Sequence, residues 1–413
     1  MRHRTSVKAL VVGLAAVTAI AGCGREESGG DDSSAAPGIT DTTIKVGSSF
    51  PLSGPLAGLG TAARGGVLAY LGAVNDAGGV TLSDGVARQI ELVDYDDGYD
   101  PARAVQNYQR LVDQDEVFGV MQTFGTATNL AIMERAQQLE VPHVFTHSGA
   151  PALSGDQEAH PWTVGWRPTY AGEGAAYGEY FAAQDRPLRV AVLSQNDDLG
   201  EAYLSGFEEA IEGSQVEIVA EQTYEPSDAT LDSQITNLAS SDADVLFSAV
   251  AFPNLQTGLL KRAREIGWSP TIAVITITSS IQKVVEPAGV TDEDDVISAN
   301  FVKAPDDPQW AEDDDVAEFV SRMEQYSPDA DPQLANAAWG YGAAATLVAA
   351  LEGMEDLSRQ GLMDSIHQLE GEIPMLLPGV TLDGTSSSEP PIHGYRLQEY
   401  ADGRWNLLDE TGS

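Results

Sequence analysis

The chain has 413 residues, one cysteine, and 63 Asp and Glu against 22 Lys and Arg, which gives a formal net charge of −41. A single cysteine excludes a disulfide framework and a cysteine-based zinc site. The acidic balance excludes nucleic acid as a partner, because phosphate binding needs basic patches. Acidic runs such as residues 292–295 and 312–315 are typical of a solvated surface that keeps a protein soluble. Cation binding by these runs is the alternative.

The N-terminus has the pattern of a bacterial lipoprotein signal. Three basic residues among the first eight precede an apolar run at residues 9–20, which is too short to span a bilayer, since that needs about 20 residues. Small residues then lead directly to Cys23. The pattern predicts a signal peptide over residues 1–22, cleavage before Cys23 and diacylation of its thiol. An ordinary secretory signal with an incidental cysteine is the alternative.

The next segment predicts a flexible tether over residues 23–41. Residues 24–38 are mostly Gly, Ser, Asp, Glu and Ala, a composition that cannot bury enough apolar surface to order itself. Two acyl chains hold a protein durably at a membrane. We therefore expect the folded part to be lipid-anchored on the extracytoplasmic face of the cell membrane.

The remaining chain alternates β-branched runs with amphipathic helical patterns, which is typical of βαβ units around a parallel sheet. Asp100 and Pro101 predict a helix start, with an N-cap followed by proline at the first helical position. A second predicted helix begins at Thr126. The strands predicted for this first lobe are residues 44–46, 90–93, 117–121 and 141–146.

A second set of such units follows, and the length allows two domains of roughly 100–200 residues each. Its predicted strands are residues 189–193, 216–219, 245–250 and 271–277. The segments predicted to cross between the lobes are residues 161–167, 296–302 and 374–378, and an alanine-rich helix at 339–351 returns to the first lobe. The predicted N-terminal lobe is residues 42–164 plus 303–372, and the C-terminal lobe is residues 165–302 plus 373–410.

Two loops that follow predicted strands are candidate ligand sites, because open α/β sheets bind ligands at the carboxyl ends of their strands, near helix N-termini. Gly125 permits close backbone approach, and Thr126 offers a hydroxyl and an amide to a carboxylate or polar head group. A simple N-cap is the alternative for Thr126. The candidate residues of the two loops are Phe124, Gly125, Thr126 and Thr128, then Thr146, His147 and Ser148.

Enzyme signatures are missing from the sequence. It contains no G-x-S-x-G elbow, no H-E-x-x-H, no Walker loop and no G-x-G-x-x-G that opens a helix, and its histidines show no metal-ligand spacing. The acidic segment around Gly98 does not match an EF-hand calcium loop, because Val93 and Tyr95 occupy positions where that loop needs carboxylates. The sequence predicts no enzyme, no metal and no cofactor.

Six short sequences in a fixed order carry a family resemblance. They are Ile-Lys-Val-Gly at 44–47, Pro-Leu-Ser-Gly-Pro at 51–55, Asn-Asp-Ala-Gly-Gly at 75–79, Asn-Asp-Asp-Leu-Gly at 196–200, Asp-Ser-Gln-Ile at 232–235 and Arg-Glu-Ile-Gly-Trp at 264–268. From about residue 43 to 408 the chain resembles the type I solute-binding proteins of the branched-chain amino acid ABC transporter family. The resemblance implies an α/β fold of two doubly wound parallel-sheet lobes joined by three crossovers, the type I periplasmic binding protein fold, which closes on a ligand.

The resemblance also identifies positions where this chain departs from leucine-type binders. Two tyrosine positions of the second lobe fall on Leu199 and Phe252, and the acid for the ligand ammonium falls near Thr276. A buried ammonium without a carboxylate is costly, so we expect the ligand not to be a zwitterionic α-amino acid held in the usual way. Asp197 or Asp198 is the alternative partner for an ammonium.

The sequence therefore predicts a monomeric solute-binding lipoprotein that delivers a small organic ligand to the permease of an ABC importer. The ligand is expected to be a carboxylate or amide with an apolar or aromatic body, with an amino acid left open. A ligand-sensing module of the same fold that feeds a regulator is the alternative. Besides the lipidated Cys23, the predicted ligand-binding residues are Phe124, Gly125, Thr126, Thr128, Thr146, His147, Ser148, Asp197, Leu199, Phe252 and Thr276.

Overall fold

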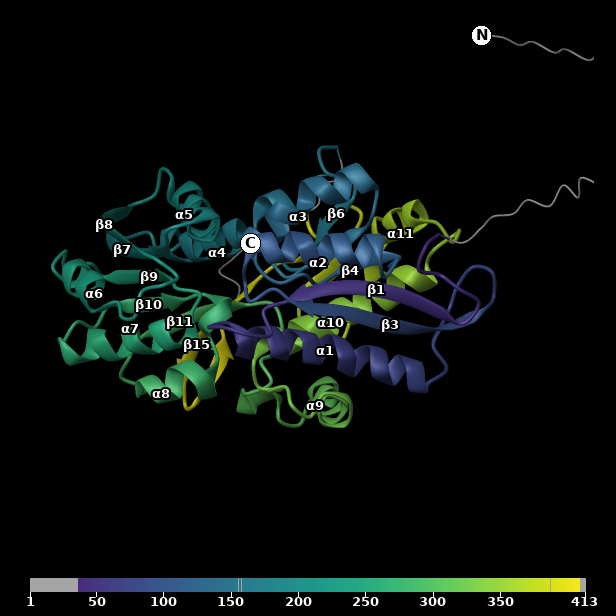
Figure 1. Cartoon of the computed structure of the whole chain (residues 1–413). Coiled ribbons are helices and arrows are strands. Elements are labelled where there is room, and N and C mark those ends of the chain that lie inside the picture. The colour runs from purple at the N-terminus through teal and green to yellow at the C-terminus, as the bar shows by residue number, and fades with distance from the viewer. Residues whose placement is uncertain (1–35, 155, 157, 387, 409–413) are drawn as a thin grey trace, which may run out of the picture. The chain divides into compact units, whose positions relative to one another are not determined.

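The computed structural model describes residues 36–154, 156, 158–386 and 388–408. The predicted signal peptide, Cys23 and most of the predicted tether lie outside the described residues. Within that part of the chain, two separate sheets are each covered by helices (Figure 1). No helix of the described residues is both long and apolar enough to cross a membrane.

The first sheet has the strand order β2-β3-β1-β4-β5-β6, and all neighbours are parallel except β2 and β3. Its strands are β1 (Thr43–Phe50), β2 (Val80–Thr81), β3 (Ala87–Asp96), β4 (Gly119–Met121), β5 (His143–Thr146) and β6 (Thr163–Gly165). Its helices are α1 (Ala57–Asp76), α2 (Pro101–Asp113), α3 (Thr126–Leu139), α9 (Asp314–Tyr326), α10 (Ala335–Glu352) and α11 (Arg359–Ile366). We call this sheet with these helices the first lobe.

The second sheet has the order β16-β15-β11-β10-β9-β7-β8. Its strands are β7 (Leu188–Gln195), β8 (Val216–Tyr224), β9 (Val245–Ala249), β10 (Thr271–Val274), β11 (Val296–Asn300), β15 (Arg396–Ala401) and β16 (Arg404–Leu407). Its helices are α4 (Tyr170–Ala182), α5 (Asp198–Ile211), α6 (Asp232–Ala239), α7 (Pro253–Glu265) and α8 (Glu286–Ala288). We call this set the second lobe. Strands β7 to β11 are mutually parallel, whereas β15 and β16 are antiparallel additions.

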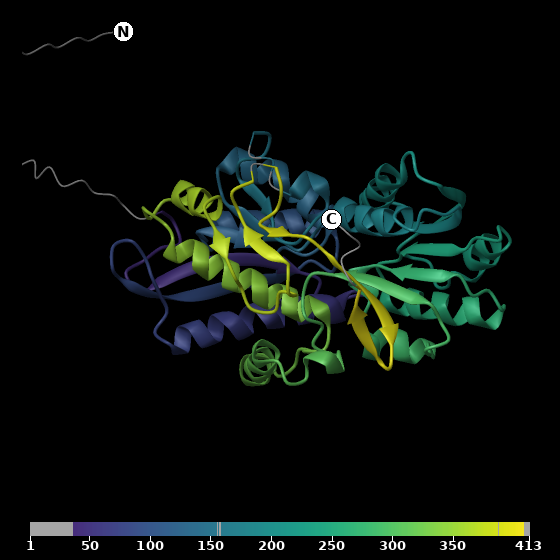
Figure 2. The same cartoon turned by 180° about the vertical axis from the view of Figure 1, so that it is seen from behind.

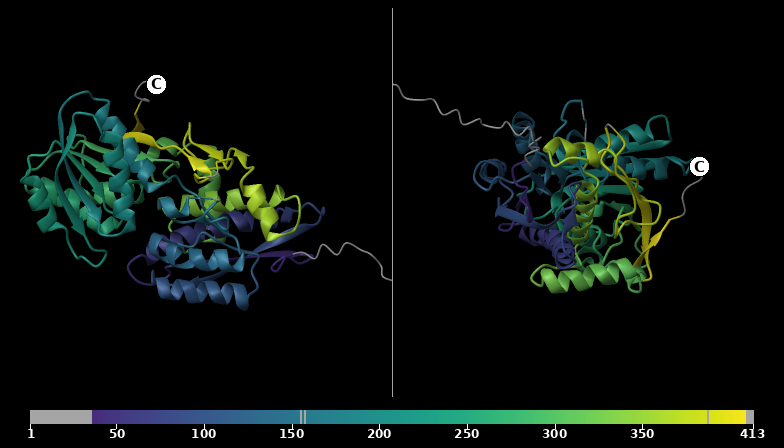
Figure 3. Two further views of the ribbon diagram at one scale, coloured as in Figure 1. Left: turned by 90° about the horizontal axis from the view of Figure 1, so that it is seen from above. Right: turned by 90° about the vertical axis from the view of Figure 1, so that its right-hand side faces the viewer.

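The chain passes between the two sheets three times, as expected, but the last passage follows residue 393, whereas the sequence predicted it at residues 374–378. It leaves the first lobe between β6 and α4, returns after β11, and leaves again before β15. A small antiparallel sheet of β12 (Glu370–Gly371), β13 (Thr381–Asp383) and β14 (Ile392–His393) precedes the last passage, which Figures 2 and 3 show in yellow.

Two other predicted elements differ from the structure. The strand predicted at residues 271–277 ends at Val274, and Thr276–Thr278 form a short 3-10 turn instead. The segment predicted as a crossing at 296–302 is mostly the buried strand β11, and only its last two residues leave the sheet. Tertiary pairing with β10 and β15 decides both boundaries, and the sequence pattern does not contain that information.

Local capping explains the helix that follows the acidic segment at the end of β3. The Asp100 side chain accepts hydrogen bonds from the backbone N–H groups of Ala102 (2.8 Å) and Arg103 (3.1 Å), and Pro101 occupies the first helical position. An N-cap carboxylate satisfies amides that have no partner inside the helix. Asp100 therefore acts as the predicted helix cap.

Glycines bring one pair of helices into backbone contact in each lobe. A Cβ on Gly66 of α1 would lie 1.9 Å from the carbonyl oxygen of Ala337 in α10, and one on Gly206 of α5 would lie 1.9 Å from that of Ala171 in α4. Such contacts leave no room for a side chain. They fix α10 and α4, the helices that carry Trp339 and Glu173 of the site described below.

We predict that Gly66→Ala lowers the free energy of unfolding by about 1–3 kcal/mol, because the added methyl group forces α1 and α10 apart. Gly258→Ala is the matched control. Gly258 lies exposed inside α7, and a Cβ added there would meet no atom of the described residues within 4 Å, so this change should leave stability equal or raise it by up to about 1 kcal/mol. Urea unfolding of both variants checks the prediction, and equal effects would contradict it.

Candidate ligand-binding site

A partly open cavity lies between the two lobes. The first lobe contributes Leu56, Tyr99, Phe124, Gly125, His147 and Trp339 to its lining, among others. The second lobe contributes Tyr170, Gln195, Leu199, Ala251, Phe252 and Ile277. Arg167, on the first passage between the sheets, also lines it. The walls are mostly apolar and aromatic, with a single cationic side chain among the described residues.

The structure brings six of the predicted site residues to this cavity. They are Phe124, Gly125, Thr126, His147, Leu199 and Phe252. They come from loops at the carboxyl ends of β4, β5, β7 and β9, or from the helix starts that follow them. This is the edge of each sheet at which open α/β folds bind ligands.

The other predicted residues do not line the cavity. The Thr128 hydroxyl donates to the carbonyl oxygens of Phe124 and Gly125, and Asp197 caps α5. The Ser148 hydroxyl lies 2.9 Å from that of Thr126. Their polar atoms form hydrogen bonds within the loops that line the cavity.

Thr146 and Thr276 are fully buried as well. The Thr146 hydroxyl has no hydrogen-bond partner among the described residues. Thr276 is bonded to Glu173 through both its backbone N–H (2.6 Å) and its hydroxyl (2.8 Å). Thr276 thus supports a buried carboxylate of another helix.

His147 forms an aromatic wall with no hydrogen-bonding capacity left for a ligand. Its ring stacks on Phe124 at 4.5 Å between centroids. Nε2 lies 3.0 Å from Nδ2 of Asn336 and must accept, because an amide nitrogen only donates. Nδ1 then donates to Oε1 of Gln122 at 2.7 Å. Burial, aided by the charge of Arg167, lowers the pKa of His147 to about 3, so the ring stays neutral.

Tyr99 covers the helix start that the sequence offered as a head-group site. Gly125 has φ +95°, and a Cβ there would lie 2.2 Å from Cε2 of the Tyr99 ring, so no other residue fits under that ring. Burial raises the pKa of the Tyr99 hydroxyl, while the backbone N–H of Thr126 acts on that hydroxyl in the opposite direction. The Thr126 amide therefore faces Tyr99 in this structure.

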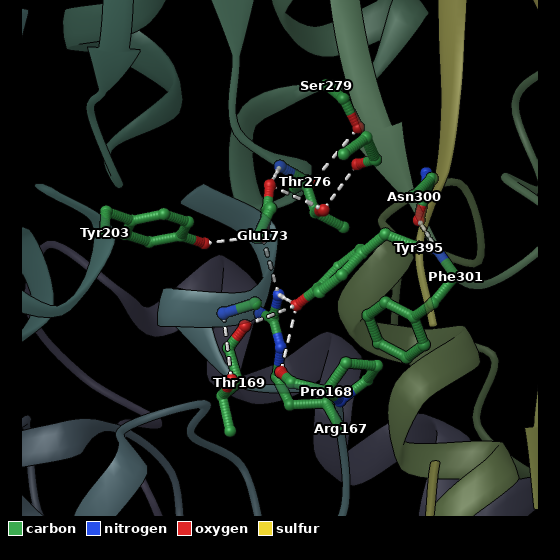
Figure 4. A network of polar contacts seen from close by, with 12 residues as sticks. Arg167, Pro168, Thr169, Glu173, Tyr203, Thr276, Ser279, Asn300, Phe301 and Tyr395 are labelled. Atoms are coloured by element: carbon green, nitrogen blue, oxygen red, sulfur yellow. Dashed lines mark hydrogen bonds and ion pairs between the residues drawn. The ribbon is translucent and has the colours of Figure 1, made fainter. Parts of the chain in front are cut away.

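Arg167 is the main functional candidate that the sequence reasoning missed. Its side chain is 2% exposed, and its guanidinium carbon lies 4.6 Å from the ring centroid of Trp339 and 5.3 Å from that of Phe301. Nη2 donates to Oε2 of Glu173 at 3.1 Å and to the hydroxyl of Tyr395 at 3.2 Å (Figure 4). The available signal was an acid six residues after the arginine, in a segment that the sequence pattern predicts only as a crossover.

Glu173 is a buried carboxylate that contacts Thr276, the residue at which the family's acidic position falls in this chain. It is completely buried, and its Oε1 accepts both hydrogen bonds from Thr276. Its Oε2 accepts from Arg167 and from the hydroxyl of Tyr203 at 2.7 Å. Burial raises the pKa of Glu173, and Arg167 opposes that effect. The single hydrogen of the Thr276 hydroxyl also lies within reach of the Ala299 carbonyl oxygen. Glu173 is thus bonded to Arg167, Tyr203 and the backbone N–H of Thr276, which makes it a positioning group for Arg167, and it does not line the cavity.

An ion pair at the surface also joins the two lobes, and it is more exposed than the pair of Arg167 and Glu173. Lys283, beside α7 of the second lobe, lies 2.6 Å from Oδ2 of Asp331, which precedes α10 of the first lobe. Both side chains are about a third exposed or more, and such pairs contribute about 0–1 kcal/mol. Across residues 36–154, 156, 158–386 and 388–408, no group of three His, Cys, Asp or Glu side chains could hold a metal ion.

Two α/β lobes joined by three passages, with a small-molecule cavity between them, define a hinged binding protein. Residues 43–404 match a family model described as Periplasmic binding protein. The chain belongs to this family, whose members bind ligands and are not enzymes.

Comparisons with individual proteins show the same fold. The chain resembles the fatty acid ABC transporter substrate-binding protein from Thermomonospora curvata, with a TM-score of 0.74, 22% identity and coverage of 91% of this chain and 93% of that one. It also resembles an ABC transporter solute-binding protein from R. palustris in complex with benzoate, with a TM-score of 0.72, 19% identity and coverage of 89% and 95%. The type I periplasmic binding protein fold expected from the sequence is confirmed.

Among curated relatives, the chain is 25% identical over 248 residues to Leu/Ile/Val-binding protein homolog 7 of Brucella suis biovar 1 (strain 1330). That alignment covers 58% of this chain and 59% of the relative's own length. The chain therefore spans about three fifths of that relative.

We predict that acidification destabilises the protein through His147. Its folded pKa of about 3 lies below the unfolded value near 6.5. The unfolded chain therefore binds the extra proton, and stability present above pH 6.5 is lost as the pH falls. The loss is about 1.4 kcal/mol per pH unit. Urea unfolding at several pH values, with His147→Gln as comparison, measures it. A stability difference between the two proteins that does not change with pH would contradict the prediction.

Proposed function

We propose that this protein is an extracytoplasmic solute-binding protein that delivers a small organic ligand to the permease of an ABC importer. The observation that carries the proposal is the cavity between the lobes, whose apolar and aromatic walls come from both sheets. Family membership and the likeness to transporter-associated binding proteins support it. The predicted lobe boundaries at residues 164 and 302 are part of the same proposal, and the third boundary moves from residue 372 to the segment between β14 and β15.

The ligand class that fits this cavity is a small carboxylate or amide with an apolar or aromatic body. Phe124, Leu199 and Phe252 supply apolar surface from the two sides. None of the described side chains in the lining is acidic, and the nearby Glu173 is already bonded to Arg167, Tyr203 and Thr276. A zwitterionic amino acid would leave its ammonium buried without a counter-charge, which is costly.

The mechanism follows from a ligand that contacts both lobes at once. Such a ligand binds the closed arrangement better than the open one and shifts the equilibrium between them. Arg167 connects the three segments that join the lobes. It belongs to the first passage and contacts Phe301 of the second passage and Tyr395 of the third. The permease would then recognise the closed form.

We predict that benzoate or octanoate raises the midpoint of thermal unfolding by several degrees, whereas valine and leucine do not. A ligand at 100 times its Kd adds about 2.7 kcal/mol to the stability of the folded state. Thermal-shift measurements on protein stripped of ligand by unfolding and refolding provide the check. Strong stabilisation by valine or leucine, with none by the acids, would contradict the proposed ligand class.

The lipid anchor at Cys23 remains a proposal, and it predicts a change of location on mutation. Cys23→Ala removes the acylated thiol, so the protein should move from the membrane fraction to the soluble fraction after export. Fractionation of cells that express each form, together with uptake of labelled ligand, checks both parts. Membrane retention of the Cys23→Ala protein would contradict the anchor, and unchanged uptake in cells that lack the gene would contradict the importer role.

A further inference from the structure

Two side chains that line the cavity each have a buried nitrogen donor with no hydrogen-bond partner among the described residues. The donors are Nε of Arg167 and Nε1 of Trp339, and each side chain is 2% exposed. Buried polar groups in native proteins are nearly always paired, so an orphaned donor calls for an explanation. Here the two orphaned donors belong to residues that line the same cavity and stack at 4.6 Å.

The side-chain nitrogens of the other lining residues each have at least one hydrogen-bond partner. Nδ2 of Asn336 donates to His147, and Nδ1 of His147 donates to Gln122. Nε2 of Gln195 donates to Asp197. Within the described part of the lining, Nε of Arg167 and Nε1 of Trp339 are therefore the buried side-chain nitrogens that have no partner at all.

The guanidinium of Arg167 is held in place through Nη2, whose two hydrogens bond to Glu173 and Tyr395. Its Nε–H has no acceptor among the described residues. Carboxylate oxygens accept only, and hydrogen bonds between charged partners are about twice as strong as neutral ones. An amide offers one uncharged acceptor oxygen and brings two further donors that would need acceptors of their own.

We propose that Arg167 and Trp339 form the receptor for an anionic head group, and that the ligand of this protein is a carboxylate anion and not an amide. The inference rests on the proposed function and narrows it. It places the head group at the passage between the lobes and not at the start of α3, where Tyr99 covers the Thr126 amide. Glu173 acts as a positioning residue, because it is bonded to Arg167 and does not itself line the cavity.

The experiment compares acids with amides of the same shape on defined variants. The probe pairs are benzoate and benzamide, octanoate and octanamide, and acetate and acetamide. Trp339→Phe keeps a ring and removes the N–H. The double variant Arg167→Met with Glu173→Gln removes both buried charges together, because removing one alone leaves its partner uncompensated. Arg322→Met is the control, since Arg322 also stacks on aromatic rings, Tyr70 and Tyr341, outside the cavity lining.

Calorimetric titration should show that the wild-type protein and Arg322→Met bind an acid and ignore its amide. Trp339→Phe should bind that acid about tenfold more weakly or worse, and the double variant should not bind it at all. Acetate consists of little more than the head group. Comparing it with acetamide therefore tests the preference for a carboxylate even if neither the phenyl ring nor the alkyl chain fits the cavity. An amide that binds as tightly as its acid, or acid binding unchanged in Trp339→Phe and the double variant, overturns the inference and leaves the importer role standing.

The single variant Glu173→Gln tests whether a ligand carboxylate contacts Arg167. The readout is the ligand-induced shift of the unfolding midpoint, which would stay unchanged if Arg167 and Glu173 had only a structural role. The substitution leaves the buried guanidinium without its counter-charge, so the ligand-free protein should unfold at a lower temperature. A bound carboxylate would replace that charge, and the acid should raise the unfolding midpoint by more than in the wild-type protein, whereas the amide should not. Equal shifts from acid and amide in this variant would contradict the receptor. Failure of every acid and every amide to bind any form would instead count against both the receptor and the proposed cavity function.

Discussion

A buried ion pair at the meeting of the three passages is the interaction on which the rest of the site depends. Arg167 and Glu173 are both almost completely removed from solvent. Taking two charges out of water costs several kcal/mol per ion, and only additional hydrogen bonds and good geometry offset that cost. The protein supplies them through Thr276, Tyr203 and Tyr395. The pair is therefore held by elements of the second lobe and by the passages themselves.

The same pair links the lobes without a rigid connection between their sheets. Trp166, the residue before Arg167, donates from Nε1 to the Thr346 hydroxyl of α10 at 2.9 Å, which fixes the passage to the first lobe. Close glycine contacts fix the distance of α10 from α1 and of α4 from α5. These two helices place Trp339 and Glu173 beside Arg167 from opposite lobes. A group that binds beside Arg167 is thus in contact with the segments that must bend when the lobes move.

Much of the fold could be predicted from the sequence, because it depends on local patterns. The strands β1, β3, β7 and β9 are β-branched runs between helical patterns, and Asp100 with Pro101 is a local cap signal. The cavity loops were also within reach, since Phe124, Gly125 and His147 directly follow predicted strands. The hairpin β15–β16 was missed because its pairing with β11 joins residues about a hundred positions apart.

The charged centre of the site could not be predicted, for a physical reason. Glu173 contacts Thr276 across 103 positions and Tyr203 across 30, and no periodicity in the sequence marks those partners. The acidic position of leucine-type binders falls near Thr276 in this chain. Thr276 contacts a buried carboxylate, but that carboxylate belongs to Glu173 of α4. Tyr99 was missed because its position over Gly125 depends on the packing of two loops, which the residue pattern does not encode.

The most direct measurement is a crystal structure of the protein purified from its native host with its own ligand in place. The account predicts a carboxylate whose oxygens lie about 2.7–3.2 Å from Nε of Arg167 and Nε1 of Trp339, with its apolar body against Phe124 and Phe252. A neutral or zwitterionic ligand whose head group lies at Thr126, with both nitrogens still unpaired, would contradict it.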